Sequence, residues 1–505
     1  METDECIRQM CKQLDELDYT ELYKAYSGKI RRTQVDPKIM FKLLVCAYAL
    51  DCRSTRKIES LCRSYVPLIQ ILDGKPAPDH TTICRFRSGE KTGEAIMNLC
   101  DQYIMYLEKI GETDHKVVFL DGTKMESMAS RHSYVWRKRV VHEINKAKDR
   151  LKELLKDKQE GYTTLGKVKE YLENLEKQIK ETGIPDEKPK RGCRKPEIIR
   201  LRDEVKKLVE KWESNEAKLK IMGEDRNSYS KTDPDATFMH PKDDPTNKGP
   251  LRAEYNVQFA VNSQYITGIS LFSNPADCQT MPEMLNLMYK KQGKKYDKVS
   301  TDPGYESLSN YLYLQAHGQQ AAIKPRNFEM LKTKKFKAQI GRVENMTYKA
   351  DGDYYVCAND KKLTFAVAKT EKLQDGTTYD VKIYRCEDCV GCKYRDKCCK
   401  AKDKEKPKEV TVCDEFAQLR QQSVNLLTSK EGKLLRVNRS IQSEGSFGQM
   451  KWNHEFRRFL MCGKRKITIE LSLWALAQNG IKYIRKCASG KQQTHLWEPK
   501  ELAKS

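Results

Sequence analysis

Glu444 lies in a stretch whose residue types and spacing could hold a metal ion against a phosphate. The run from Glu431 to Lys451 contains no proline and predicts a helix. Glu444, Gly448 and Lys451 stand at i, i+4 and i+7 and therefore share one helical face. This face would combine a carboxylate for a metal ion, a backbone patch without a side chain and a cation, which suits a phosphodiester. An ordinary solvated face is the alternative.

Two aspartates end short strands elsewhere in the chain. Residues 117–120 are apolar and predict a buried strand, which Asp121 and Gly122 follow. Residues 299–301 predict another strand, which ends in Asp302. A carboxylate at the end of a buried strand is costly unless it is paired or bound to a metal ion. The alternative for the first of them is a common Asp-Gly turn.

A third chemical signal is a cluster of cysteines. Cys386, Cys389, Cys392 and Cys398 follow the spacing C-x2-C-x2-C-x5-C, which brings thiolates close enough to share one ion. Structural Zn²⁺ is the first interpretation, an iron–sulfur cluster the second, and unligated thiols the third.

Composition sets the class of partner. The 505 residues include 94 Lys+Arg and 71 Asp+Glu, which gives a net charge of +23 and favours a polyanion, with nucleic acid before an anionic membrane surface. No apolar run is long enough for a membrane span, and the first residues do not resemble a signal peptide. We therefore expect a cytoplasmic, nucleoid-associated protein without membrane contact, whose 18 cysteines are thiols or metal ligands rather than disulfides.

The elements that must position the carboxylates follow from periodicity and turn signals. In order they are a strand, an inserted helical segment, two strands, a helix, a strand, a helix and a strand. After a further interruption comes the helix with Glu444. Without the insertions this is ribonuclease H-like connectivity, with Asp121 on the central strand and Asp302 on its parallel neighbour. We therefore expect an α/β fold whose mixed sheet is flanked by helices and gathers the three carboxylates at one edge.

The same signals divide the chain into segments. We expect an all-α DNA-binding domain, a catalytic core in three pieces, an inserted antiparallel coiled-coil hairpin, an inserted β-rich segment with the cysteines, and a flexible tail. Arg56, Arg85 and Arg87 lie in short basic helices of the first domain, which suit a DNA reader, although an ordinary charged surface fits equally. The expected segments are, in that order, 1–110; 111–137 with 223–325 and 430–488; 138–222; 326–429; and 489–505.

With these residues identified, the chain resembles the DDE transposases of bacterial insertion sequences. The likeness covers nearly the whole chain and includes the block Asp302-Pro303-Gly304-Tyr305. The other blocks that carry it are residues 54–59, 78–87, 119–124, 231–239 and 444–448.

The resemblance implies that Asp121, Asp302 and Glu444 form a catalytic triad that holds two Mg²⁺ or Mn²⁺ ions about 4 Å apart. It also implies a lysine seven residues after the glutamate, which Lys451 matches. The chain departs from the family signature before the glutamate. An arginine is expected four residues before it, and a tyrosine seven before it, but Ser440 and Val437 occupy these positions and the nearest arginine is Arg439.

The implied activity is DNA transposition. The protein would bind the ends of its element on double-stranded DNA, cleave them by hydrolysis and join the freed 3′-OH to target DNA, acting as a homo-oligomer. Lys451, Arg439 and Arg458 would clamp phosphates. Two alternatives are a ribonuclease H-like nuclease without strand transfer and a transposase-derived DNA-binding protein that is no longer catalytic.

Overall fold

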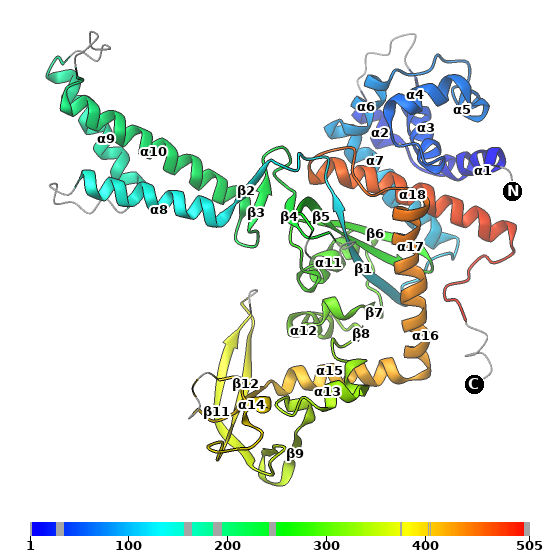
Figure 1. Cartoon of the computed structure of the whole chain (residues 1–505). Helices are drawn as coiled ribbons and strands as arrows, with labels where there is room; N and C mark the ends of the chain where they lie inside the picture. The colour runs from blue at the N-terminus through cyan, green and yellow to red at the C-terminus, as the bar shows by residue number, and fades with distance from the viewer. Residues whose placement is uncertain are drawn as a thin grey trace.

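The structure is a computed structural model in which a central sheet carries three outlying parts (Figure 1). It describes residues 3–26, 35–155, 164–184, 194–241, 249–373, 376–401, 403 and 406–498. Helical segments lie at two corners of the molecule and a β-rich segment at a third, while the long helix α18 (Lys464–Ala488) runs across the top of the sheet.

The central sheet has six strands. Along the sheet, β5 (Arg252–Asn262) pairs antiparallel with β1 (Val117–Glu126), and β1 pairs parallel with β7 (Lys298–Thr301). β8 (Gln320–Ile323) continues the parallel half. β6 (Tyr265–Phe272) and β4 (Thr237–Met239) both pair antiparallel with β5. The parallel pairing of β1 with β7 is the one expected from the sequence, whereas β4 was not expected.

Alternation along β1 directs its side chains to two different cores. Val117 and Phe119 join the large core that includes α18, whereas Val118 and Leu120 join a second core on the opposite face. The second core lies under α11 (Met281–Gln292) and α12 (Leu308–Ala316). Because both faces are buried, the strand consists almost entirely of apolar residues before Asp121.

The N-terminal part is all-helical, as expected, and it is tightly docked. Its buried residues belong to the same core as α18 and one face of the sheet. Arg53 forms an ion pair of 2.9 Å with Glu470 of α18 and lies 3.6 Å from the centre of the Phe456 ring. The helices are α1 (Thr3–Asp15), α2 (Thr20–Ala25), α3 (Pro37–Ala49), α4 (Thr55–Ser64), α5 (Val66–Ile71), α6 (His80–Ser88) and α7 (Glu90–Lys109).

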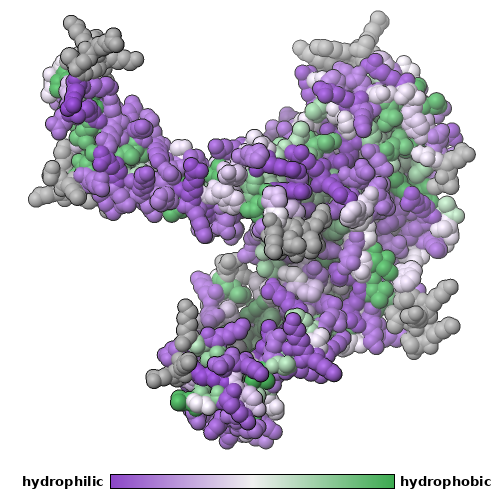
Figure 2. All heavy atoms as spheres, viewed as in Figure 1, coloured by the Kyte–Doolittle hydropathy of each residue, from purple (hydrophilic) through white to green (hydrophobic). Residues whose placement is uncertain are grey.

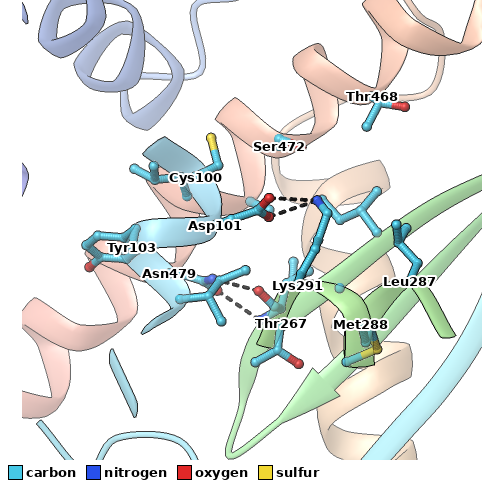
Figure 3. Close-up of a pocket in the computed structure, with 16 residues that line it drawn as sticks. Cys100, Asp101, Tyr103, Thr267, Leu287, Met288, Lys291, Thr468, Ser472 and Asn479 are labelled. Atoms are coloured by element: carbon cyan, nitrogen blue, oxygen red, sulfur yellow. Dashed lines mark hydrogen bonds and ion pairs between the residues drawn. The ribbon is translucent and has the colours of Figure 1, made fainter. Parts of the chain in front are cut away.

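A small cavity marks the joint between this domain and the core (Figure 3). Asp101 of α7 pairs with Lys291 of α11 at 2.8 Å across it, and burial raises the pKa of Asp101 despite this partner. Asn479 of α18 bonds both backbone groups of Ile266 in β6, each at 2.9 Å. The first contact joins the helical domain to α11, and the second joins α18 to the sheet. In both, the polar side chains already have partners within the protein.

The inserted helical segment contains three helices rather than the expected two-helix hairpin. α8 (Arg137–Leu154) and α9 (Leu165–Glu181) both pack against α10 (Glu197–Met222) around a common apolar core. The expected hairpin did not include α8, although Val140, Ile144, Ala147 and Leu151 give it a buried face at helical spacing. In Figure 2 these helices project from the body of the molecule with mostly hydrophilic surfaces.

The second insertion is β-rich, as expected, but its last helix belongs elsewhere. Its antiparallel sheet follows the order β13-β12-β11-β10-β9. α15 (Asp414–Thr428) lies within the expected range 326–429, yet the Ser423 hydroxyl bonds both backbone groups of Ile323 in β8, so this helix covers the central sheet. The strands are β9 (Thr347–Lys349), β10 (Tyr354–Val356), β11 (Lys362–Lys372), β12 (Thr378–Cys386) and β13 (Glu409–Val412).

The expectation of a flexible tail from residue 489 is wrong for residues up to 498. Trp497 and Asn438 exchange two hydrogen bonds, of 2.8 and 2.9 Å, and the backbone N–H of Gln493 donates to Glu112 at 2.8 Å. This part of the tail therefore packs on the helix that leads to Glu444. Residues 499–505 lie outside the described residues.

Candidate active site

Asp121 lies in the middle of β1 and not in a turn. The strand continues to Glu126, so Asp121 and Gly122 are paired with Phe259 and Gln258 of β5. The Asp121 side chain is 6% exposed, and its Oδ1 accepts the N–H of Gly122 at 2.8 Å. The glycine is needed for space rather than for turning, because a Cβ there would come 2.1 Å from the Gln258 amide nitrogen.

Asp302 is brought to Asp121 by the register of two parallel strands. Leu120 pairs with Thr301, so the two aspartates follow paired residues. Asp302 then caps the short 3-10 helix η2 (Pro303–Tyr305), and its Oδ1 accepts the N–H of Gly304 at 2.9 Å. The chain thus turns away from the sheet directly after the second carboxylate, which leaves both at the edge where β7 ends.

Glu444 is placed by an aromatic stack. Phe447, three residues after it, lies with its ring 4.5 Å from that of Phe259, the residue paired with Asp121. This stack fixes the helix against β5 and sets Glu444 beside the strand that carries Asp121. Unlike Asp121, the Glu444 side chain is 54% exposed.

The helix around Glu444 is continuous but wider than an α-helix. α16 (Lys430–Arg439) is followed by the π-helix η6 (Ser440–Glu444), by α17 (Gly445–Gly448) and by a second π-helix, η7 (Gln449–Asn453). A π turn accommodates an extra residue, so a residue five before the glutamate can face it. This geometry accounts for the one-residue offset of Arg439 from the family signature, and it also alters the simple i, i+4, i+7 face.

Arg439 joins two of the three carboxylates. One nitrogen of its guanidinium donates to Glu444 at 2.6 Å, and another lies 3.9 Å from Asp121. The Ser440 hydroxyl donates to the second oxygen of Glu444 at 3.0 Å. The structure therefore links Asp121 to Glu444 through an arginine, while strand register places Asp302 next to Asp121.

A further acid, Asp277, lies next to Asp121 and Asp302 and was not predicted from the sequence. It stands in the loop after β6, in the 3-10 helix η1 (Asp277–Gln279), and accepts hydrogen bonds of 2.8 Å from Asn256 and from Gln258. Its sequence surroundings contain no metal-ligand spacing that would have identified it. A pointer was available in β5, where Glu254, Asn256 and Gln258 place buried polar side chains at alternate positions of one strand.

The donor set fits a hard divalent cation. The acids supply carboxylate oxygens at an open sheet edge, and such ligands suit Mg²⁺ or Mn²⁺. As the side chains stand, no group of three or more His, Cys, Asp or Glu within the described ranges is drawn together around one ion. The position of Arg439 gives a physical reason, because its positive charge already balances Asp121 and Glu444.

The other basic residues expected at this site have structural partners. Lys451 is buried at 8% exposure and donates to the backbone oxygen of Lys124 at 3.3 Å. Arg458 is half-exposed and donates to three backbone oxygens of the loop after β1, at residues 127–129. In the structure as it stands, Lys451 contacts the second half of β1 and Arg458 contacts the loop that follows it.

One buried acid in the neighbouring strand β5 has a raised pKa. Glu254 of β5 is 3% exposed, and burial raises its pKa to about 7, against the opposing effect of nearby lysine and arginine side chains. Across the sheet, Glu254 is paired with Glu126 of β1. Glu126 forms an ion pair of 2.9 Å with Arg131.

The predicted DNA contact at Arg87 is wrong. Arg87 is 4% exposed, and its guanidinium donates to the Tyr48 hydroxyl and the Arg53 backbone oxygen at 3.0 and 2.8 Å. Its hydrogen bonds are made inside the helical domain because α6 packs with this face inward. Arg56 and Arg85 lie on exposed faces of α4 and α6.

The cysteine segment gathers more thiols than the sequence spacing predicted. One small cavity is lined by Cys386, Cys389, Cys392 and Cys398, together with Cys399 and the distant Cys357. Burial raises the pKa of the Cys386 thiol to about 12. The backbone N–H of Lys408 donates to the Cys389 sulfur at 3.4 Å. The side chains lack a metal-binding geometry within the described ranges, so the structure does not support the predicted Zn²⁺.

Comparison with known proteins gives two matches. Residues 356–484 match the family model described as a transposase DDE domain, and residues 2–89 match a transposase domain, DUF772. The first match includes the cysteines and Glu444, whereas Asp121 and Asp302 lie between the two. No curated protein and no solved structure matches the chain. No described helix is long and apolar enough to cross a membrane.

Proposed function

We propose that this chain acts as a DDE transposase of the insertion-sequence type, which is the family that its two matches support. It binds the ends of its DNA element, cleaves them by metal-assisted phosphodiester hydrolysis and joins the freed 3′-OH ends to target DNA. The observation that supports this proposal is that Asp121 and Asp302 follow paired residues of two parallel strands, while Arg439 contacts both Asp121 and Glu444. The strand order supports a ribonuclease H-like core with two insertions.

Asp121, Asp302 and Glu444 are the residues that would hold the divalent cation, Mg²⁺ or Mn²⁺. When bound, such a cation polarises the phosphodiester and makes a water molecule more acidic. The chain itself supplies two fixed oxygen donors, because Asp121 is buried in β1 and Asp302 is held by its capping bond. Glu444 is the exposed, movable member of the set.

Arg439 has two successive partners in this proposal. Before DNA binds, it balances the charge of Asp121 and Glu444. A phosphate of the DNA end is a comparable anionic partner for its planar guanidinium, which can donate two parallel hydrogen bonds. The arginine thereby positions the DNA end, and the carboxylates then bind the cation more tightly than in the DNA-free protein.

The DNA duplex would contact exposed basic residues around this site and in the helical domain. Arg56 and Arg85 remain candidates on the helical domain, and Arg458 is one at the rim of the site. The protein would work on bacterial nucleoid DNA in the cytoplasm, as an assembled homo-oligomer. The three-helix insertion is a candidate for contacts in that assembly because it projects from the body (Figure 1).

The test is an end-cleavage and joining assay. Purified protein is incubated with a labelled duplex that carries the element's own end, with Mg²⁺ and a target plasmid. We expect cleaved and joined products from the wild type. Glu444→Ala and Asp302→Ala should each slow cleavage at least about 1,000-fold, which corresponds to about 4 kcal/mol of activation free energy, while end binding is retained.

Glu415→Ala is the matched control for the loss of a carboxylate, because Glu415 is exposed on α15 of the same family-matched segment. It should cleave like the wild type. Cleavage retained by Asp302→Ala would overturn the assignment of the site. Cleavage without joining would favour a plain nuclease, and binding without cleavage would favour a DNA-binding protein that is no longer catalytic.

A further inference from the structure

We infer that Asp277 is a positioning residue of the active site, which strengthens divalent-cation binding through Asp302. The inference rests on the proposed function and adds a fourth carboxylate to it. Asp277 is outside both family-matched segments and comes from the loop between β6 and α11. Its place is defined by a chain of hydrogen bonds that starts at Tyr305, inside the same loop as Asp302.

The hydrogen bonds run in one direction. The buried Tyr305 hydroxyl donates to the side-chain oxygen of Gln258, so the amide nitrogen of Gln258 faces the other way. That nitrogen donates to Asn256 and to Asp277, each at 2.8 Å. The Asn256 nitrogen donates to the same Asp277 oxygen at 2.8 Å. Asp277 is therefore an acceptor at the end of a relay, which is the role of an ionised carboxylate.

The second oxygen of Asp277 lies close to Asp302. A Cβ built on Gly304 would be 3.0 Å from Asp302 Oδ1 and 3.3 Å from Asp277 Oδ2. A Cβ built on Gly122 would be 2.8 Å from Asp277 Oδ1. Asp277 thus approaches the site between the residue after Asp121 and the loop after Asp302, and the two glycines leave room for it.

The Tyr305 hydroxyl stands at the other end of this relay, where it donates to Gln258. A carboxylate fixed next to Asp302 adds to the attraction for a cation there. It also holds the Asp302 loop through the relay, as outer partners of metal ligands do.

The experiment measures Mn²⁺ binding to the full-length protein without DNA, by the electron paramagnetic resonance signal of free Mn²⁺. Asp277→Asn keeps the size of the side chain and removes its charge. We expect it to weaken Mn²⁺ binding roughly 10- to 100-fold. In the cleavage assay it should raise the Mg²⁺ concentration for half-maximal rate by a similar factor, with a smaller effect on the rate at saturating Mg²⁺.

Two further variants make the test specific. Asp277→Glu restores the charge and should recover most of the Mn²⁺ affinity. Tyr305→Phe keeps Asp277 but releases the Gln258 amide, so it should weaken Mn²⁺ binding less than Asp277→Asn. Glu283→Gln is the control, because it removes an exposed carboxylate from the neighbouring helix α11 and should bind Mn²⁺ like the wild type.

The outcomes separate this inference from the proposed function. Wild-type Mn²⁺ affinity in Asp277→Asn, with affinity lost in Asp302→Ala, would overturn the role of Asp277 and leave the cation site intact. Unchanged affinity in Asp302→Ala, or no Mn²⁺ binding by the wild type, would overturn the cation site itself. Should Asp277→Asn not fold, as judged by thermal unfolding, Tyr305→Phe decides: weakened binding supports the inference and unchanged binding overturns it.

Discussion

The carboxylate site and the cysteine segment are two clusters that residue types alone suggested, and they were assembled in opposite ways. The carboxylates are far apart in the sequence; strand register places Asp302 next to Asp121, and an aromatic stack sets the helix of Glu444 against β5. The cysteines are close in sequence and share one small cavity with Cys357. In the first cluster each acid has a partner that fixes or balances it, whereas in the second the buried thiol of Cys386 is held in its protonated form.

The difference teaches that proximity and readiness for a ligand are separate properties. Local spacing brought the cysteines together, but it did not orient them around an ion within the described residues. The acids are not arranged around one ion either. There the cause is identifiable, because the Arg439 guanidinium already contacts Asp121 and Glu444. The three experiments below sharpen or break this contrast.

The largest effect is expected from Arg439→Ala. Losing a positioned donor to the phosphate should slow DNA cleavage about 100-fold. Because the competing cation is gone, Mn²⁺ should bind the DNA-free protein at least as tightly as it binds the wild type. Arg439→Lys is the control, since it keeps the charge but not the planar fork. Weaker Mn²⁺ binding by Arg439→Ala would contradict the idea that this arginine stands in for the cation.

A pH-dependent effect is expected from Glu254→Gln. The folded-state pKa of about 7 exceeds the unfolded value near 4.3, so the folded state holds the proton more tightly. The stability that this proton contributes is present below about pH 4 and is lost as pH rises through 7. Glu254→Gln should therefore gain stability relative to the wild type between pH 5 and 8, by up to about 3 kcal/mol.

Urea unfolding at several pH values measures this gain. Glu283→Gln is the matched control, because its carboxylate is exposed and should give no pH-dependent difference from the wild type. A constant difference between Glu254→Gln and the wild type across the range would show that Glu254 is ionised in the folded protein throughout.

The smallest effect concerns the cysteines. Cys386→Ser buries a hydroxyl among Leu363, Tyr384 and Val410 and should cost about 1–3 kcal/mol of unfolding free energy. Cys392→Ser, at a partly exposed position, should stay within about 0.5 kcal/mol of the wild type. Neither substitution should change the rate of Mg²⁺-dependent cleavage under conditions in which both variants are folded. Elemental analysis checks for zinc. One zinc atom per chain in the wild type, lost in both variants, would show that the cysteines bind a metal and would contradict the contrast between the clusters.

The sequence by itself determined the apolar residues of β1 before Asp121, the end of β7 before Asp302 and the helix of Glu444, but not that β1 continues past Asp121 to Glu126. It could do so because apolar periodicity and capping residues are local signals, and helix α3 shows this directly: the Asp36 side chain accepts from Lys38 and Ile39 as its cap. The resemblance to the family also depended on contiguous blocks of residues.

The tertiary structure alone decided which side chains meet. The π turn that lets Arg439 reach Glu444 depends on the packing of the helix against β5, which no local spacing encodes. Arg87 was taken for a surface residue because its burial depends on how α6 docks. Asp277 lies in a loop whose sequence carries no metal-ligand spacing, and only the folded β5–β6 hairpin places the amides of Asn256 and Gln258 against it. Burial and contacts between distant segments are properties of the folded chain, and these residues acquire their roles only there.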